Sequence, residues 1–345
     1  MSGRHFYLDV GVGESRGVVT LDGRPEHLMI ARDGDLQVQT LGARVAARIR
    51  SVERSLGLAF LDLGEGPDAA LNMAPEMGRI AEGGWVEIEV RSEGRSGKGA
   101  SARWLGAAEG PSRLLAPGPN LEARLTILAK GARIERGPAA RALADQAQEE
   151  VFETVFLLPG GGSIAVETTR ALTAVDVDLG GRPGESAKRA AKAANLAALS
   201  HAARVLRLKG LGGLVVVDLA GRGHDGAALL AAARIAFAAD NPGVALGAVS
   251  RFGTLELTIP RRARPTLDVL VGDGRGPSAI TSAMALLRAL EREAAGDGGG
   301  RFEAVASPEI AGAASPYLAR LTGRFGARLG LRTEPNRAGF EVVRQ

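Results

Sequence analysis

The feature that most constrains the fold is a helix-length segment between two strand-like segments rich in valine. Residues 171–178 (ALTAVDVD) and 214–221 (LVVVDLAG) have the β-branched composition of strands. The second is an almost continuous apolar run, which is typical of a strand buried on both faces. Residues 185–208, between them, place apolar side chains at helical spacing. This order predicts a parallel crossover within an α/β unit.

Aspartates end both predicted strands. Asp176 and Asp178 are two residues apart, so both point to one face, and Asp218 lies at the end of the next strand. Such strand ends meet at the sheet edge where α/β proteins bind ligands. Acids gathered there repel unless a cation lies between them, and Mg²⁺ is held by one or two carboxylates with waters and phosphate oxygens. We therefore expect a Mg²⁺ site, with Mn²⁺ as the alternative ion; the competing interpretation is that each acid only caps a turn or helix.

The other segments favour further units of mixed α and β structure. Short strands with turns fill residues 1–40, and closely spaced strands over 41–106 are typical of an OB-fold β-barrel. Proline and glycine make 107–137 a linker or a reduced insert, and 261–278 a basic, glycine-rich linker. Helix, strand, helix and strand patterns follow at the C-terminal end, with the second helix expected over residues 314–329. The expected domains are 1–40, 41–106, 107–137, 138–265 (an α/β unit) and 279–345 (a small α/β module).

Composition excludes several chemistries. The 345-residue chain has no cysteine, which rules out disulfides, thiolate metal sites and a cysteine nucleophile. Its four histidines are scattered, so no zinc site is expected. No run of about 18 apolar residues occurs, and the first residues lack a signal-peptide pattern. We therefore expect no membrane association and a cytoplasmic location.

Charge and aromatic residues point toward nucleic acid. Of 43 basic residues only five are lysines, and arginine pairs bidentately with phosphate; a GC-rich genome explains the same composition equally well. Arg91, Arg95 and Lys98 lie among glycines whose backbone N–H groups can also hold phosphate. Phe60, on a predicted barrel strand, is a candidate for stacking on a base, with a place in the barrel core as the competing interpretation.

An ordered series of segments resembles the ribonuclease E/G family. VERSLGLAFLDLGEG (52–66) is similar to the family's "IEPSLxAAFVDYG", and RSGKGA (95–100) to its "RGxKGA". ALTAVDVD (171–178) is similar to "ALTAIDIN", GGLVVVDL (212–219) to "GGLIVIDF", and SRFGTLEL (250–257) to "SRFGLLEM". The best match lies over residues 155–265.

The resemblance implies a cytoplasmic endoribonuclease that cuts single-stranded RNA with Mg²⁺. It also implies an RNase H-like part, interrupted by an OB-fold RNA-binding barrel, and a DNase I-like catalytic part. By position, Asp176 and Asp218 fall on the metal-binding aspartates, and Asp178 falls on a catalytic position. Phe60 and Lys98 fall on RNA-contacting positions, and we add Arg95 and Arg91 as neighbouring RNA-binding cations.

The chain departs from the family pattern in several places. Asp178 stands where the family has asparagine, Ala69–Ala70 replace a second RNA-stacking phenylalanine, and Arg170 replaces a glutamate. Residues 107–135 are too short for the family's five-prime phosphate sensor, and 269–278 lack the zinc-link cysteines. A zinc-bridged tetramer is therefore not expected, and a homodimer through the C-terminal module stays open.

Three functional hypotheses follow. The first is a compact Mg²⁺-dependent endoribonuclease in RNA processing or decay. The second is a catalytically degenerate paralogue that binds RNA without cutting it, in RNA or ribosome maturation, which Asp178 and the missing phenylalanine motivate. A DNA-specific nuclease is the third, and it has the least support.

Overall fold

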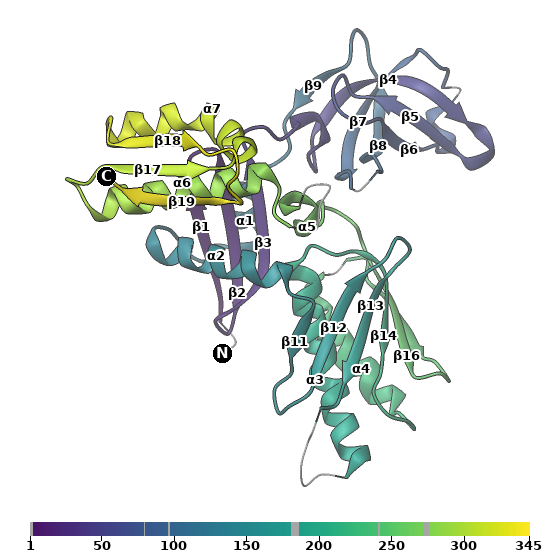
Figure 1. Ribbon diagram of the computed structural model, residues 1–345. Coiled ribbons are helices and arrows are strands. Elements are labelled where there is room, and N and C mark those ends of the chain that lie inside the picture. Colours follow the sequence, from purple (N-terminus) through teal and green to yellow (C-terminus); the bar gives the residue numbers. More distant parts are fainter. Residues whose placement is uncertain (1–2, 79, 96, 181–185, 241, 272–275) are drawn as a thin grey trace.

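The computed structural model describes residues 3–78, 80–95, 97–180, 186–240, 242–271 and 276–345. The strands form four sheets, which are arranged as separate lobes around the N-terminal sheet (Figure 1). The predicted mixed α/β class is confirmed at this level. The start of the helix predicted over 185–208, and residues 272–275 of the segment compared with the zinc link, lie outside the described residues.

A closed five-stranded barrel, consistent with an OB-fold, is formed within residues 41–107. It comprises β4 (Arg44–Glu53), β5 (Leu58–Asp62), β6 (Ala69–Asn72), β7 (Trp85–Ser92) and β8 (Ser101–Ala107). The ring closes because β4 pairs with both β5 and β7, while β6 pairs in parallel with β8. Gly99 is needed before β8, since a Cβ there would lie 1.8 Å from the backbone oxygen of Asp68.

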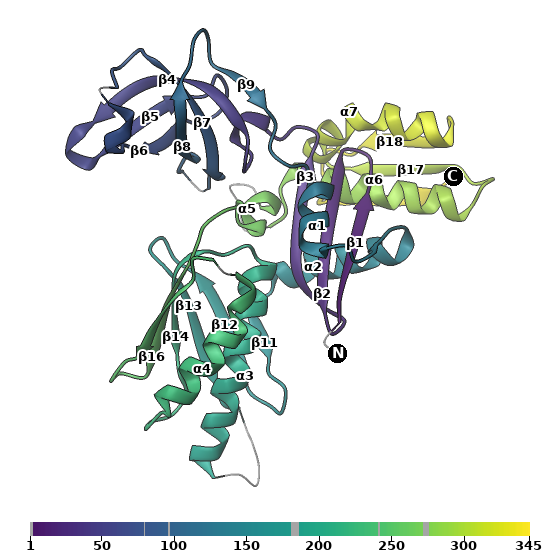
Figure 2. The ribbon, with the colours of Figure 1, turned by 180° about the vertical axis from the view of Figure 1, so that it is seen from behind.

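The N-terminal sheet is covered by one helix on each face (Figure 2). Its strand order is β10 (Ile134–Glu135), β1 (Arg4–Val10), β2 (Glu14–Leu21) and β3 (Arg24–Arg32). Phe6 and Leu8 pack on α1 (Leu121–Ala129), whereas Tyr7 and Val18 face α2 (Pro138–Phe152). The alternation along each strand thus builds two small cores, one on each side.

The third sheet carries the aspartates. Its strand order is β11 (Val155–Leu157), β12 (Ser163–Thr168), β13 (Thr173–Asp178), β14 (Gly213–Asp218), β16 (Thr254–Ile259) and β15 (Ala245–Val249). The predicted crossover is confirmed: β13 and β14 pair in parallel, with α3 (Ala187–Leu208) between them. Helices α3 and α4 (Gly226–Ala236) cover one face, which Figure 2 shows in front of the sheet.

The other face of this sheet is open, which corrects one expectation. Residues 214–221 were predicted to be buried on both faces, yet Leu214 is 39% exposed and Asp218 is also exposed. Within this run, Val215, Val217 and Leu219 are buried in the core beneath α3. A continuous apolar run is therefore compatible with a strand buried on both faces and with a strand that is buried on one face and partly apolar on the other.

The C-terminal unit packs two helices on a three-stranded sheet. Its elements are α6 (Ala279–Gly296), β17 (Phe302–Ala306), α7 (Pro308–Phe325), β18 (Leu329–Thr333) and β19 (Phe340–Arg344), with strand order β18-β17-β19. Sequence patterns missed β18, because its residues LGLRT lack a clear alternation. They also placed the second helix at 314–329. Helix α7 begins earlier because Ser307 caps it and Pro308 occupies its first turn.

Both segments expected to be linkers contain regular structure. Residues 107–137, left open between a linker and a reduced insert, contain β9 (Arg113–Ala116), α1 and β10. Residues 261–278 contain the short helix α5 (Thr266–Leu270), whose Leu270 is fully buried in the core beneath α2. The domain boundaries drawn from the sequence stay predictions.

His201 is a buried histidine on α3. It is 8% exposed, and Arg204 lies 3.0 Å from its Nε2 atom. Burial, together with the neighbouring cations Arg204 and Arg24, lowers the pKa of His201 from 6.5 to about 4. The imidazole is therefore neutral in the folded protein at neutral and mildly acidic pH.

This shift predicts an acid-sensitive fold. In the unfolded chain His201 gains a proton near pH 6.5, and in the folded protein only near pH 4, so stability falls as the pH drops through this window. The loss reaches on the order of 3 kcal/mol. Urea denaturation at a series of pH values should show a shallower decline for His201→Gln than for the wild type. Equal slopes for the two proteins would contradict the assignment.

Candidate active site

Asp176 and Asp218 lie side by side on the open face of the third sheet. They are register partners on the parallel strands β13 and β14. Register partners on adjacent strands are about 4.8 Å apart along the sheet. The burial pattern places both carboxylates on the face away from α3, since Val175, Val177 and Val217 are buried beside them and the aspartates are exposed. The predicted meeting of two distant acids at one edge is thus present.

Asp178 lies two residues after Asp176 on β13, so its side chain is the next one on the same face. It is the register partner of Ser163, and its Oδ1 accepts a hydrogen bond from the Gly180 backbone N–H at 3.0 Å. Gly162 packs on the backbone here, because a Cβ there would lie 2.4 Å from the Asp178 oxygen. Two residues along a strand is about 6.6 Å, so Asp178 borders the acid pair and does not complete a compact triad.

A buried asparagine holds the segment that follows Asp218. Asn195 of α3 is 1% exposed, and its Nδ2 donates to the Ala220 oxygen at 3.0 Å. The Ala220 N–H donates in turn to Asn195 Oδ1 at 2.9 Å. This two-way pairing fixes the backbone two residues after Asp218, so α3 positions the acid through its loop as well as through the sheet.

The donor set fits a weakly held hard cation. Within the described ranges, no cluster of three or more histidine, aspartate or glutamate side chains suited to a metal occurs. Neither Asp176 nor Asp218 takes part in an ion pair there, so both carboxylates are available. Mg²⁺ typically uses one or two carboxylates and keeps waters, whereas Ca²⁺ or Zn²⁺ needs a fuller protein shell.

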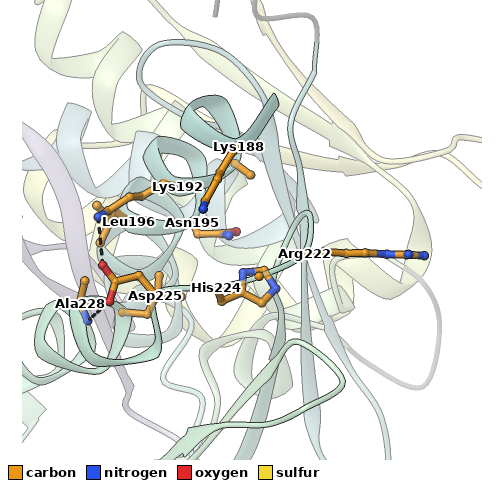
Figure 3. A pocket seen from close by; sticks show the side chains of 11 residues that line it. Lys188, Lys192, Asn195, Leu196, Arg222, His224, Asp225 and Ala228 are labelled. Carbon is orange, nitrogen blue, oxygen red and sulfur yellow. Dashed lines mark hydrogen bonds and ion pairs between the residues drawn. The ribbon is translucent and has the colours of Figure 1, made fainter. Parts of the chain in front are cut away.

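A basic cavity lies on the helical side of the same edge (Figure 3). Its volume is about 270 Å³, and it lies between the first turns of α3, the loop after β14 and the start of α4. Lys188, Lys192 and His224 line it, and Figure 3 shows the Lys188 amine directed toward Asn195. Lys192 bonds Asp225 at 3.1 Å, and this contact lowers the pKa of Asp225. Lys188 also lines the cavity, and its positive charge can attract an anion.

The barrel presents two of the predicted RNA contacts together. Phe60 alternates with the buried residues Ala59 and Leu61 on β5, so its ring faces outward and is only half-buried. Its register partner is Ala70 on β6, one of the two alanines compared above with the family's second phenylalanine. Lys98 is exposed in the tight turn before β8, the strand on the other side of β6. The competing core placement of Phe60 is therefore wrong.

The two arginines of this region differ in their surroundings. Arg91 pairs with Glu89 at 3.2 Å. Glu89 also accepts a hydrogen bond from Arg103, and this bond is the main cause of the lowered pKa of Glu89. Arg95 lies close enough to Arg261 to depress the pKa of Arg261, after the larger effect of burial. Two neighbouring cations at the junction between barrel and third sheet favour a polyanion.

The barrel and the acid pair are well separated within the chain. The barrel meets the third sheet where the Glu93 N–H donates to the Arg262 oxygen at 2.7 Å, just beyond the end of β16. The register partner of Asp218 is Thr254, at the beginning of β16. The six residues of β16 separate this contact from the acid pair by about 20 Å. A ligand that contacts both places must therefore be long.

Residues 134–262 match the Ribonuclease E/G family. The matched segment contains the acid pair, Asn195 and the basic cavity. This segment is therefore similar to the ribonuclease E/G family. The resemblance seen in the sequence is thereby confirmed for the part of the chain that carries the aspartates.

Curated relatives agree with this assignment. The chain is 33% identical over 157 residues to Ribonuclease E of Haemophilus influenzae, covering 42% of this chain and 17% of that protein. It is 35% identical over 122 residues to Ribonuclease E of Escherichia coli, covering 34% and 11%. It is 27% identical over 211 residues to Ribonuclease G of Salmonella typhimurium, covering 56% and 43%. The chain thus spans less than half the length of each of these relatives.

Sequence reasoning missed Asn195 and the cavity. Asn195 opens the segment NLAALSHAARV, and a single polar residue on the apolar face of an amphipathic helix is the signal that would have marked it. In the sequence, Lys188 and Lys192 look like ordinary residues of a solvent-exposed helix face. Their grouping with His224 depends on a loop that the sequence alone does not place.

Replacing Asn195 tests its positioning role. Asn195→Ala removes the side-chain partner of both the N–H and the carbonyl of the partly buried Ala220, which costs about 1–3 kcal/mol. Chemical denaturation should show this loss of unfolding free energy. Asn195→Asp should not recover the loss, because it buries a carboxylate opposite the Ala220 carbonyl. Ser200→Ala, at an exposed position of the same helix, is the matched control and should leave the free energy of unfolding unchanged. Equal stability of wild type and Asn195→Ala would exclude the role.

Proposed function

We propose that this protein is a metal-dependent endoribonuclease that cleaves single-stranded RNA in RNA processing or decay. The observation that carries the proposal is the direct register of Asp176 with Asp218 on an open sheet face, inside the segment that matches the ribonuclease E/G family. The relatives named above are ribonucleases by name. Mg²⁺ is the proposed ion and Mn²⁺ the alternative.

The roles of the residues follow from their positions. Asp176 and Asp218 would hold the divalent ion from two adjacent strands. When bound, such an ion lowers the pKa of a water and stabilises the charge that develops on a phosphodiester. Asp178, on the same face, would orient the attacking water or add a ligand. Asn195 keeps the loop after Asp218 in place, and the exposed face leaves room for a polynucleotide chain.

The proposed RNA path connects the two separated surfaces. The outward ring of Phe60 offers a stacking surface, and Lys98 and Arg95 supply positive charge beside it. The arginine pair Arg95 and Arg261 continues this charge toward the third sheet. Beyond the acid edge, the cavity at Lys188 is suited to a backbone phosphate. Arg91 contributes less to this path, because Glu89 neutralises it.

Other parts of the proposal rest on the family resemblance. They are an RNase H-like character of the N-terminal sheet, a DNase I-like character of the third sheet, a cytoplasmic location and a homodimer through the C-terminal unit. Among the described residues, no helix is both long and apolar enough to traverse a bilayer.

Two observations favour the rival function, RNA binding without cleavage. Asp178 adds a negative charge beside the acid pair where the family has an amide, and Ala70 lies beside Phe60 without a ring. Retardation of labelled single-stranded RNA without cleavage, with or without Mg²⁺, would favour this rival. A parallel single-stranded DNA substrate tests the DNA-specific alternative.

Neutralising either aspartate tests the catalytic proposal. Asp176→Asn and Asp218→Asn each remove one carboxylate from the pair, so Mg²⁺-dependent cleavage should fall by about 10³-fold or more, at the scale expected for loss of transition-state charge stabilisation. RNA binding measured without metal should change little, because the barrel is untouched. With labelled single-stranded RNA, a denaturing gel measures cleavage, and retardation in a native gel without metal measures binding.

Glu167→Gln is the matched control for these variants. Glu167 is an exposed acid on β12, on the same open face, and its register partner is Ala174, two residues before Asp176. Its neutralisation should leave cleavage unchanged. Cleavage that persists in EDTA, or in Asp176→Asn, would refute the mechanism.

The barrel contributes to binding rather than to chemistry. Phe60→Ala and Lys98→Ala should each weaken RNA binding. For Phe60→Ala, which removes one stacking ring, the loss of affinity should be roughly tenfold. Fluorescence anisotropy with a labelled RNA, repeated at two salt concentrations, should show a smaller salt slope only for Lys98→Ala. Unchanged affinity in Phe60→Ala would remove the ring from the RNA path.

A further inference from the structure

Phe252 is an aromatic side chain placed where a globular core does not need it. Phe252 is 77% exposed. The guanidinium of Arg251 lies 4.6 Å from the ring centre. One face of the ring is thus backed by a cation, and the remaining surface is open to solvent.

The turn that carries Phe252 is firmly held. Ser250 Oγ accepts hydrogen bonds from the N–H groups of Phe252 and Thr254 at 3.2 Å, and it lies 2.8 Å from Thr254 Oγ1. The Gly253 N–H donates to the Ser250 oxygen at 3.1 Å. An exposed ring on a locked turn loses little conformational entropy when it binds a ligand.

This turn borders the acid pair. Thr254, two residues after Phe252, is the register partner of Asp218. The Leu219 N–H, directly after Asp218, donates to the Gly253 oxygen at 3.0 Å. Gly253 also lies against His224 of the basic cavity, since a Cβ there would be 3.1 Å from His224 Nε2. Phe252 therefore stands at the same strand ends as the carboxylates.

We propose that Phe252, backed by Arg251, is a stacking platform for one nucleobase of the RNA chain, next to the phosphodiester held at Asp176 and Asp218. The inference deepens the proposed function and rests on it. A ring with a cation on one face suits a nucleobase, which brings both a π-face and a neighbouring phosphate. The platform would fix which phosphodiester lies at the acid pair.

The surroundings favour a base over a protein partner. Polar and small residues flank Phe252 in its turn, namely Ser250, Arg251 and Gly253. The other strongly exposed apolar side chains of this sheet, Leu157 and Val155, belong to β11 at the far edge of the strand order. Phe252 is thus an isolated ring beside cations, whereas a protein docking surface needs a contiguous apolar patch.

Abasic RNA gives a direct test. A set of single-stranded oligonucleotides carries one abasic nucleotide at successive positions around the cleavage site. With the wild type, the abasic nucleotide at one position should lower kcat/KM by roughly tenfold. Phe252→Leu should lose a similar factor on normal RNA and show no further loss with the abasic nucleotide at that position. Phe252→Trp should retain the wild-type profile.

Ile235→Ala is the matched control. Ile235 is 79% exposed on α4 of the same unit, and its replacement should change neither kcat/KM nor the abasic profile. An abasic profile that is identical in wild type and Phe252→Leu would overturn the proposal. A Phe252→Leu variant that changes the oligomeric state in sedimentation, with an unaltered abasic profile, would overturn it in favour of a contact between copies.

The same series separates this inference from the proposed function. Binding of the oligonucleotides to Asp218→Asn, followed by anisotropy, does not require cleavage. If the wild type does not cut RNA, the proposed function fails, while a Phe252-dependent abasic penalty in binding would still support the platform. If RNA is cut and the penalty does not depend on Phe252, the platform alone fails.

Discussion

Helix α3 is the constraint on which the rest of the structure depends. Its apolar face packs on Val175 and Val217, and this crossover places β13 and β14 in the parallel register that brings Asp176 next to Asp218. Midway along the helix, Asn195 holds the loop after β14. Its C-terminal turns reach the N-terminal sheet, where Arg204 donates to the Pro25 oxygen at 2.6 Å. One helix therefore sets both the site and its attachment to the rest of the chain.

Buried charge makes that attachment specific. Glu26 is fully buried between Arg4, at 2.7 Å, and Arg207 of α3, at 2.8 Å. Burial would raise the pKa of Glu26, but the hydrogen bond from Arg4 and the charge of Arg207 outweigh it, so the pKa is lowered. A second set, Glu14 with Arg32 and Arg288, ties the C-terminal unit to the same sheet. Removing one partner would leave a buried charge unpaired, which costs more than the pair contributes.

The sequence predicted what depends on periodicity and failed where tertiary contacts decide. The crossover, the barrel strands and the aspartates at strand ends follow from local patterns, and Asp176 and Asp218 were found because both follow valine-rich runs. The open face of the sheet was not predicted, because one-sided and two-sided burial of an apolar strand look alike. Asn195 and the Lys188 cavity were missed because their partners are backbone atoms and loops far away in the chain. Strand β18 forms because β17 offers it an edge, despite its weak pattern.

The one-sided sheet also explains how opposite charges can serve one polyanion. The carboxylates lie on the open face, and the cations of the cavity lie on the helical side, with the loop after Asp218 between them. This separation keeps Lys188 and Lys192 from neutralising the acid pair, whose proposed role is to hold a metal ion. Direct pairing of lysine with Asp218 would be favourable in the free protein and would compete with the metal. Lys192 pairs instead with Asp225, so both Lys188 and the acid pair stay available on adjoining surfaces.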